Sequence, residues 1–309
     1  MFGKRTVVDM INRSAENDAD RRNFLRTAGI AGLGVVGAGT ASGLLGSAAS
    51  AAPSDAAVLN FALNLEYLEA EFYSHAVFGR GLSAALTTGR GDRGPVIGGR
   101  QVSFESRVIK NYALEIAQDE IAHVKFLRSA LGSAKVSRPK INIKESFTAA
   151  AQAAGLIGPS QTFDPYANEN NFLLAAYIFE DVGVTAYKAA APLINNKAYL
   201  EAAAGILAAE AYHAATIRTS LYEGKFYEAA RKISDARDSL DGMADRDQGI
   251  GNRNRANILP ADANGIAYSR GPGRVLNVVY LTADRARRGG FFPDGVNGQV
   301  NTSSGRSGA

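Results

Sequence analysis

The sequence predicts an all-α fold: a four-helix bundle with one long crossover, followed by a loop-rich C-terminal extension. Three observations support this prediction. Four long segments place apolar residues at helical spacing. Stretches containing glycine or proline separate these segments, and one of the stretches is long enough to be a crossover. The second pair of segments also repeats residue spacings of the first pair, as expected for two related halves of one bundle.

The first two bundle helices are predicted over residues 54–79 and 103–131. Both segments carry apolar residues on neighbouring helical faces, and the first has no internal glycine or proline. Residues 79–99 between them are rich in glycine and include Pro95, which predicts a loop. Gly132 is predicted to end the second helix.

The third and fourth helices are predicted over residues 168–190 and 196–221, with a short turn between them. A connection of roughly 35 residues precedes this pair, and that length can lead from one end of a bundle to the other. Three prolines interrupt the connection, and residues 145–156 within it are a short helical candidate. Short connections within each pair and one long crossover between the pairs define the predicted topology.

The C-terminal extension begins with a fifth predicted helix over residues 226–240. Residues 242–309 are rich in glycine, asparagine, aspartate and arginine and read as loops. Their single apolar run, 275–281, is too short for its pattern to separate a strand from a helix, and a short helix begun by Pro272 is favoured. The chain therefore divides into an N-terminal segment, 1–51, a bundle, 52–224, and the extension, 225–309.

The N-terminal segment differs in composition from the rest of the chain. Arg21 and Arg22 precede a run without charge over residues 27–54. The run is long enough for a membrane-spanning helix, but its many glycines make it weakly apolar, and Ala49-Ser50-Ala51 is a candidate cleavage site. The paired arginines resemble a twin-arginine export signal. That resemblance implies recognition by the twin-arginine translocation machinery and a location in the periplasm or cell envelope.

Composition excludes several classes of function. The 34 basic and 30 acidic side chains nearly balance, so no face suited to nucleic acid is expected. The chain has no cysteine, which excludes disulfides, thiolate ligands and cysteine nucleophiles. Any metal ion must therefore be held by nitrogen and oxygen. A hydrophobic content of 46% is enough for a sizeable core.

Two predicted helices carry the motif Glu-x-x-His, and the two others carry a glutamate in apolar or aromatic surroundings. Residues three apart on a helix share a face, so both members of each motif can point into the bundle. A buried carboxylate needs a partner or a metal ion, because an isolated charge in a core is very costly. The predicted metal ligands are Glu66, Glu120, His123, Glu180, Glu210 and His213.

Matched offsets relate the two halves. Tyr73 follows Glu66 by seven residues, and Tyr187 follows Glu180 by the same interval. Arg128 and Arg218 each follow the glutamate of a Glu-x-x-His motif by eight residues, at Glu120 and Glu210. The two tyrosines are candidates either for hydrogen bonds to glutamate ligands or for core packing.

Three further acidic residues and one histidine near these motifs allow alternatives. Asp119 is a candidate hydrogen-bond partner for His123, four residues later. Glu69 and Glu71 compete with Glu66 for the ligand position, and the offset to Tyr73 favours Glu66. The remaining histidine, His75, has no partner at motif spacing and is predicted to lie at the rim or surface.

The ligand set resembles that of the ferritin-like di-iron and di-manganese carboxylate proteins. The resemblance extends over residues 55–221. Residues 65–73 and 289–298 are similar to a bacterial ferritin-like group related to desiccation-associated proteins. The resemblance to the ferritin-like proteins implies a site for two iron or manganese ions. In that site Glu66 and Glu180 would be terminal ligands, Glu120 and Glu210 would bridge the ions, and each ion would bind one histidine.

The resemblance implies two classes of function. One is a di-metal oxidoreductase that acts on a small substrate, dioxygen or hydrogen peroxide, in a catalase-like or ferroxidase-like reaction. The alternative is a non-catalytic protective or envelope-associated module whose metal site is structural or vestigial. The long extension departs from the short chains of iron-storage cages, and the absence of cysteine excludes a rubrerythrin with its electron-transfer module. A homo-oligomer is compatible with the sequence but is not indicated by it.

Overall fold

A computed structural model describes residues 53–242 and 244–305 of the 309-residue chain. The predicted signal segment, 1–51, lies outside the described residues. The described part is mostly helical with a few very short strands, which confirms the all-α prediction. Its four long helices are α3 (Asp55–Phe78), α4 (Arg107–Leu131), α6 (Glu169–Ala190) and α7 (Lys197–Glu223). These bounds agree with the predicted helices to within four residues at each end.

Each bundle helix begins after a serine or asparagine whose side chain accepts a hydrogen bond from the first helical turn. Such caps satisfy backbone N–H groups that have no partner inside the helix. The capping residue of α4 is Ser106, and this explains why the helix starts later than position 103. Gly79 ends α3 in the left-handed conformation, at φ 68°, which glycine adopts without strain. The four N-caps are Ser54, Ser106, Asn168 and Asn196.

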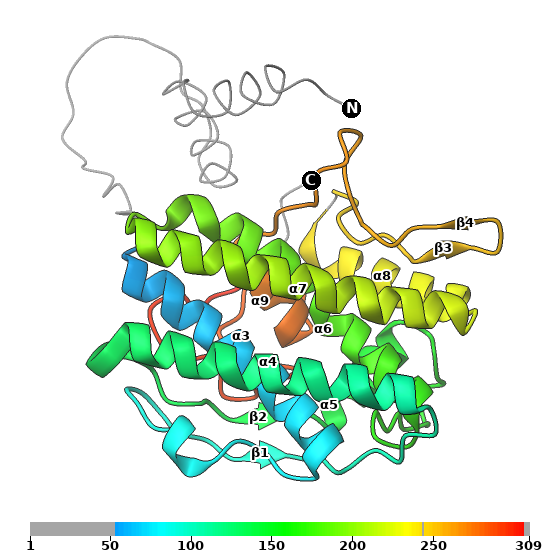
Figure 1. Cartoon of the computed structure of the whole chain (residues 1–309), viewed down its shortest axis with the longest axis horizontal. Coiled ribbons are helices and arrows are strands. Elements are labelled where there is room, and N and C mark those ends of the chain that lie inside the picture. The colour runs from blue at the N-terminus through cyan, green and yellow to red at the C-terminus, as the bar shows by residue number, and fades with distance from the viewer. Residues whose placement is uncertain (1–52, 243, 306–309) are drawn as a thin grey trace. The chain divides into compact units, whose positions relative to one another are not determined.

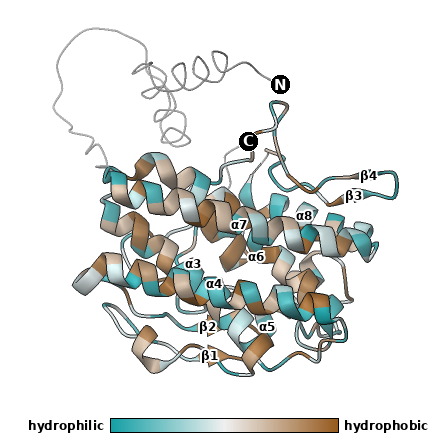
Figure 2. Ribbon diagram, viewed as in Figure 1, coloured by the Kyte–Doolittle hydropathy of each residue, from teal (hydrophilic) through white to brown (hydrophobic). Residues whose placement is uncertain are grey.

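The bundle consists of two closely packed helix pairs, α3 with α4 and α6 with α7. In Figure 1, α4 and α7 lie nearest the viewer. The helices α3 and α6 are central, because every residue of 57–74 and of 172–187 is buried. In contrast, α4 and α7 each keep one exposed face, and Figure 2 shows hydrophilic and hydrophobic residues mixed along both. The side of the bundle formed by α3 and α6 is therefore covered by other parts of the protein.

Two connections lie side by side at one edge of the bundle. The loop after α3 contains the 3₁₀ helix η1 (Ala84–Leu86) and the strand β1 (Val96–Ile97). The crossover contains η2 (Gly132–Ala134), the strand β2 (Ile141–Asn142) and α5 (Glu145–Ala153). β1 and β2 pair in parallel, with Val96 opposite Ile141. The helix α5 matches the short helical candidate at 145–156, whereas neither strand was predicted, since two-residue strands leave no periodic pattern.

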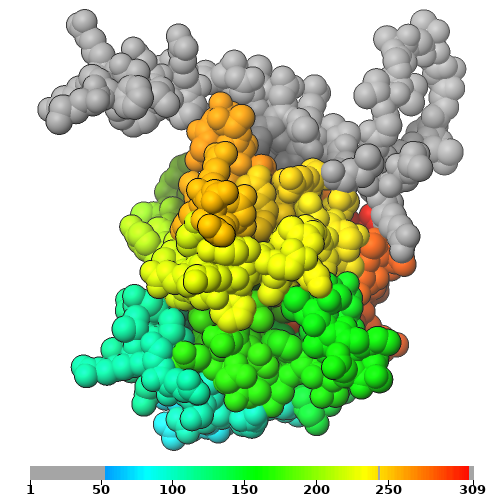
Figure 3. Space-filling model, turned by 90° about the vertical axis from the view of Figure 1, so that its right-hand side faces the viewer, coloured from blue at the N-terminus to red at the C-terminus, as the bar shows by residue number. Residues whose placement is uncertain are grey.

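The extension packs against the bundle instead of standing apart from it. Within the bundle, the 3₁₀ helix η3 (Ala191–Leu193) links α6 to α7. The extension follows α7 and contains α8 (Tyr227–Asp241), the antiparallel strands β3 (Gly251–Asn252) and β4 (Arg255–Ala256), and α9 (Pro272–Tyr280). The favoured short helix after Pro272 is thus present. Figure 3 shows the yellow and orange parts of the extension as one contiguous surface region.

Beneath that surface the extension contributes to the core. Phe291 is fully buried, and its ring packs at 5.0 Å from the Phe147 ring and 4.9 Å from the Phe179 ring. In α9, residues 275–280 are all buried. The extension therefore covers the side of the bundle formed by α3 and α6.

Among the described residues, no helix combines the length and the apolar character that a membrane span requires.

Candidate metal centre

The six predicted ligands come together between the four bundle helices. Glu66 is supplied by α3, Glu120 and His123 by α4, Glu180 by α6, and Glu210 and His213 by α7. Each residue lies near the middle of its helix, and the four glutamates are at most 1% exposed. Ligand atoms of Glu66, Glu120, His123 and Glu210 all lie within 4.8 Å of one another. Residues separated by up to 144 positions in sequence thus form one cluster.

Both histidines present the Nδ1 atom to the carboxylates. His123 Nδ1 lies 3.2 Å from Glu66 Oε2, 3.7 Å from Glu120 Oε2 and 3.8 Å from Glu210 Oε1. His213 Nδ1 lies 3.2 Å from Glu120 Oε1 and 3.7 Å from Glu180 Oε2. The two ring centroids are 6.2 Å apart. Glu120 therefore lies between the two histidines, with one carboxylate oxygen towards each.

Several polar atoms of this cluster are buried without a hydrogen-bond partner. Ordinary cores contain few such atoms, because each one costs free energy of desolvation. Here they converge from three helices, and all are oxygen or nitrogen donors of the kind that iron, manganese and zinc accept. The cluster is compatible with a bound metal ion. The unpartnered atoms are both carboxylate oxygens of Glu120 and of Glu210, Glu180 Oε2 and His213 Nδ1.

Two tyrosines donate hydrogen bonds to the Oε1 atoms of Glu66 and Glu180, and each bond joins the two halves of the bundle. Tyr73 of α3 donates a hydrogen bond to Glu180 Oε1 on α6, and Tyr187 of α6 donates one to Glu66 Oε1 on α3. Each tyrosine thus serves the glutamate of the other half. These bonds leave the Oε2 atoms of Glu66 and Glu180 facing the histidines. Of the two roles considered for the tyrosines, the structure supports hydrogen bonding.

Asp119 serves a different histidine from the one predicted. Its Oδ2 atom lies 3.1 Å from His213 Nε2 on α7, whereas the sequence prediction paired Asp119 with His123 on its own helix. That pairing was wrong, because the short aspartate side chain extends from α4 across to α7. An acceptor at Nε2 favours the tautomer that leaves the Nδ1 lone pair free, which is the form that binds a metal ion.

The arginines at matched offsets also have matched partners. Arg128 Nη1 donates a hydrogen bond to Tyr67 Oη at 2.6 Å, and Arg218 Nη1 donates one to Asp181 Oδ2 at 2.8 Å. Tyr67 directly follows Glu66, and Asp181 directly follows Glu180. Each arginine therefore ties a Glu-x-x-His helix to the residue beside the glutamate of its partner helix. The matched offsets point to the arginines but not to Tyr67 and Asp181.

The two residues considered as alternatives to Glu66 occupy different environments. Glu71 lies outside the cluster: it forms an ion pair with Arg138 and accepts a hydrogen bond from the Leu82 N–H at 3.2 Å. His75 Nδ1 lies 2.8 Å from the Glu71 carbonyl oxygen, and the ring is partly exposed. Glu69 is buried at the cluster, as a fifth carboxylate beside the four predicted ones. Its position three residues after Glu66, on the same face of α3, is the signal that identifies it.

The crowded carboxylates do not all ionise in the absence of metal. Burial raises the pKa of Glu66 to about 7 and that of Glu180 to about 8, and the nearby Glu120 carboxylate adds to both shifts. Burial also raises the pKa of Glu210 and of Glu69. Glu120 behaves in the opposite way: burial opposes its ionisation, but His123 and His213 lower its pKa to about 2. Glu120 is therefore the carboxylate that remains charged.

The same contacts affect the histidines. Burial by itself lowers the pKa of His123, but Glu66 and Glu120 outweigh it and raise the value to about 11. For His213, Glu120, Glu180 and Asp119 outweigh burial and raise the pKa to about 9. Without metal, both rings are protonated at neutral pH. A metal ion must displace these protons, as it must displace those on the glutamates.

Comparison with known proteins agrees with the fold. Residues 54–223 match the family model described as the ferritin-like domain. The chain is 30% identical over 272 residues to the ferritin-like catalase Nec2 of Nesocodon mauritianus, covering 80% of this chain and 85% of that protein. It is 32% identical over 265 residues to the desiccation-related protein PCC13-62 of Craterostigma plantagineum, covering 80% and 84%. This chain belongs to the ferritin-like family.

Proposed function

We propose that the protein binds two iron or manganese ions at this cluster and removes hydrogen peroxide in a catalase-like reaction. The observation that carries the proposal is the convergence of unpartnered, buried carboxylate oxygens and imidazole nitrogens from different helices. Four carboxylates supply the negative charge that balances two divalent cations. The name of one relative, a ferritin-like catalase, supports the choice of reaction.

Each residue has a role in holding the ions. Glu120 and Glu210 would hold both ions, since both oxygens of each lack a hydrogen-bond partner. Glu66 and Glu180 would each hold one ion through Oε2, while Tyr187 and Tyr73 hold their Oε1 atoms. His123 and His213 would each hold one ion through Nδ1. The bound pair would supply two-electron storage, so that one peroxide is reduced to two water molecules while another is oxidised to dioxygen.

The test combines metal analysis with gas release. Protein purified from its native host should contain two equivalents of iron or manganese per chain and should release one dioxygen for every two peroxide molecules consumed. The Glu120→Gln, Glu210→Gln double variant should lack both the metal and the gas release. Metal-loaded parent protein that consumes no peroxide would contradict the catalase-like reaction.

The second relative is named a desiccation-related protein, and the alternative to an enzyme is a protective module without turnover. In that case the metal would stabilise the fold without reacting. Fully loaded protein should then show a raised melting temperature but no release of dioxygen from peroxide. The same two measurements therefore separate the enzyme from the protective module.

We also propose that the protein is exported through the twin-arginine translocation machinery to the periplasm or cell envelope. The supporting feature is the pair Arg21 and Arg22 before a weakly apolar, uncharged run. Replacing both arginines by lysine should retain the protein in the cytoplasm. Unchanged export of that variant would contradict this route.

A further inference from the structure

One difference between the two halves of the centre lies three residues after Glu66 and three residues after Glu180. Glu69 follows Glu66 by three residues, and Gly183 follows Glu180 by three residues. A methyl group at Gly183 would lie 2.2 Å from Glu210 Oε2 and 3.6 Å from Glu69 Oε1. The missing side chain on α6 thus makes room for the Glu210 carboxylate, and Glu69 approaches the same place from α3. The cluster is closed here by a carboxyl group instead of by packed apolar side chains.

A small cavity lies directly behind Glu69. Its volume is about 20 Å³, which is enough for one molecule of about the size of water. Apart from Glu69, the residues that line it are apolar or glycine, and they come from α3, α6 and the extension. These are Leu65, Leu68, Ile178, Phe179, Val182, Gly183, Val278, Val279 and Phe291.

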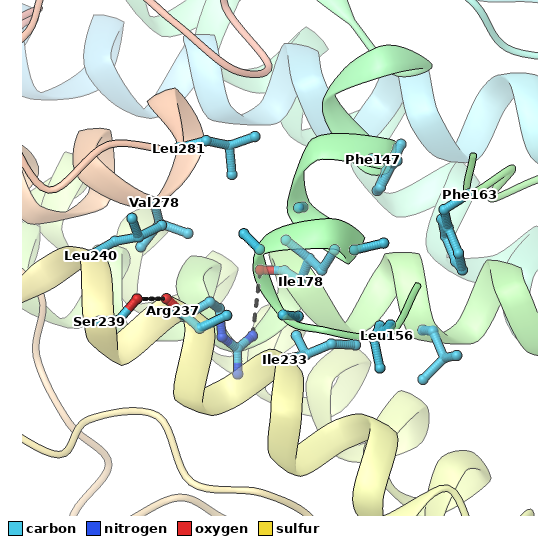
Figure 4. A pocket seen from close by; sticks show the side chains of 16 residues that line it. Phe147, Leu156, Phe163, Ile178, Ile233, Arg237, Ser239, Leu240, Val278 and Leu281 are labelled. Carbon is cyan, nitrogen blue, oxygen red and sulfur yellow. Dashed lines mark hydrogen bonds between the residues drawn. The ribbon is translucent and has the colours of Figure 1, made fainter. Parts of the chain in front are cut away.

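A second, larger cavity of about 70 Å³ lies further out, between α5, α6, α8 and α9. Figure 4 shows the mainly apolar side chains that line it, among them Phe147, Ile233 and Leu281. Its rim includes the exposed residues Ala153 and Ser239. Figure 3 shows green and yellow regions of the chain next to each other at the surface, and α5 contacts α8.

The two cavities share part of their walls. Ile178 of α6 and Val278 of α9 line both of them, so these two buried side chains separate the outer space from the inner one. A molecule that moves from one space to the other must therefore pass these two side chains. The outer cavity thus extends from the exposed residue Ala153 to Ile178 and Val278, and the inner cavity extends from these two residues to Glu69 at the cluster.

We propose that this series of cavities is a passage for dioxygen, with Ile178 and Val278 as its constriction and Glu69 as its inner end. The proposal rests on the proposed function, in which dioxygen is released at the metal centre. Dioxygen is small, uncharged and apolar, so it partitions into apolar cavities that water and ions avoid. Here the C-terminal extension gains a role, because Val278 and Phe291 form walls that the four-helix bundle alone lacks.

Polar reactants have a different approach. On the side of α4 and α7, the His123 side chain is 12% exposed and the Asp119 side chain is 45% exposed. Hydrogen peroxide and water can exchange hydrogen bonds with such groups, whereas the walls of the passage offer almost none. The centre thus has partly exposed polar groups on the side of α4 and α7 and apolar cavities on the side of α3 and α6.

Xenon provides a test that does not need metal or activity. It is apolar, binds in dry cavities and serves as a stand-in for dioxygen. Crystals of the metal-free full chain under xenon pressure should show xenon in the outer and inner cavities. In the Ile178→Phe variant, the larger ring should fill the constriction and remove xenon from the inner cavity. Absence of xenon from both cavities of the parent protein would overturn the proposal.

The metal-loaded protein gives a second, kinetic test. Ile178→Phe should slow the oxidation of the reduced metal pair by dissolved dioxygen by roughly tenfold, since a close-packed interior offers no equivalent path. Oxidation by hydrogen peroxide should keep its rate. Ile178→Ala widens the constriction and should speed the reaction with dioxygen, so the two variants move the rate in opposite directions.

Val184→Phe is the matched control, because Val184 lies on the same helix and lines a different cavity of about 100 Å³ that is bounded by α7 and the extension. It should leave both rates unchanged. Equal dioxygen rates in the parent, Ile178→Phe and Ile178→Ala proteins would overturn the passage while leaving the metal centre intact. Failure to load metal would contradict the proposed function, and the xenon result would still decide whether the passage exists.

Discussion

Tyr73 donates a hydrogen bond to Glu180, a residue on the opposite half of the bundle, and not to any glutamate of its own helix. The equivalent tyrosine of the other half, Tyr187, makes the reciprocal bond to Glu66. This exchange ties α3 to α6 at the level of the cluster. It also fixes which oxygen of each glutamate remains available for a metal ion.

Tyr73→Phe should weaken metal binding without unfolding the protein. The variant removes the hydrogen bond that orients Glu180, and loss of such an outer partner typically weakens metal affinity by about tenfold or more. Tyr166→Phe is the matched control, because Tyr166 is a buried tyrosine whose hydroxyl has no hydrogen-bond partner. Competition with a chelator measures both affinities. Equal weakening in the two variants would contradict the orienting role of Tyr73.

Glu120→Gln and Glu210→Gln should differ sharply in the metal-free protein although both should lose metal. Glu120 is the charged partner of His123 and His213, so its replacement leaves two buried cations uncompensated and should cost roughly 3 kcal/mol of unfolding free energy. Burial already raises the pKa of Glu210, and glutamine imitates its protonated form. Urea unfolding in the presence of a chelator should show a large loss for the first variant and little or none for the second.

Metal-free protein should lose stability between pH 6 and pH 9. The pKa values of Glu66 and Glu180, about 7 and about 8, lie above the ordinary value of 4.5, so the stability that these carboxyl groups contribute at low pH is lost as the pH rises through 7 and 8. The raised pKa values of His123 and His213 stabilise the folded state below about pH 6.5, and this contribution is lost as the pH rises towards 9 and 11. Both effects have the same sign. Melting temperatures in a chelator, measured across this range, should therefore fall.

Metal binding should release protons for the same reason. At pH 7 the metal-free site holds protons on both histidines and on several glutamates, and the ions must displace them. Calorimetric titration in two buffers of different ionisation enthalpy measures the number released. Binding enthalpies that do not depend on the buffer would contradict the protonation states described here.

Arg270→Met should destabilise the attachment of the extension strongly. Arg270 is fully buried and forms ion pairs with Asp241 at 2.7 Å and with Asp247. Removing one member of a buried network leaves the other charges uncompensated, at a cost of roughly 3–5 kcal/mol. The exposed pair of Arg231 with Glu228 provides the control, and Arg231→Met should leave the free energy of unfolding nearly unchanged. Urea unfolding compares the two variants.

Much of the fold followed from the sequence because the long helices leave strong periodic patterns. The first residues of α3, α6 and α7 were predicted closely, since Ser54, Asn168 and Asn196 are typical N-capping residues. The strands β1 to β4 were missed because two residues carry no period. The packing of the extension on α6 depends on contacts such as Phe291 with Phe179, which join distant parts of the chain and have no local signal.

At the site, the sequence identified which residues converge but not how they pair. The offsets from Glu66 to Tyr73 and from Glu180 to Tyr187 are the same, yet the hydrogen bonds cross between the halves. Spacing along one helix cannot reveal a contact to another helix. The same reasoning explains why Asp119 was assigned to His123 on its own helix, and why Glu69 was treated as a competitor of Glu66 instead of an additional carboxylate.

Anomalous diffraction from crystals of the iron- or manganese-loaded protein tests the central claim most directly. The measurement locates each metal ion without reference to activity. We predict two ions per chain, both bound by the six residues Glu66, Glu120, His123, Glu180, Glu210 and His213, with Glu120 and Glu210 contacting both ions. A single ion at the cluster, or ions bound only elsewhere, such as at Asp238, Asp241 and Asp247, would contradict the dinuclear centre.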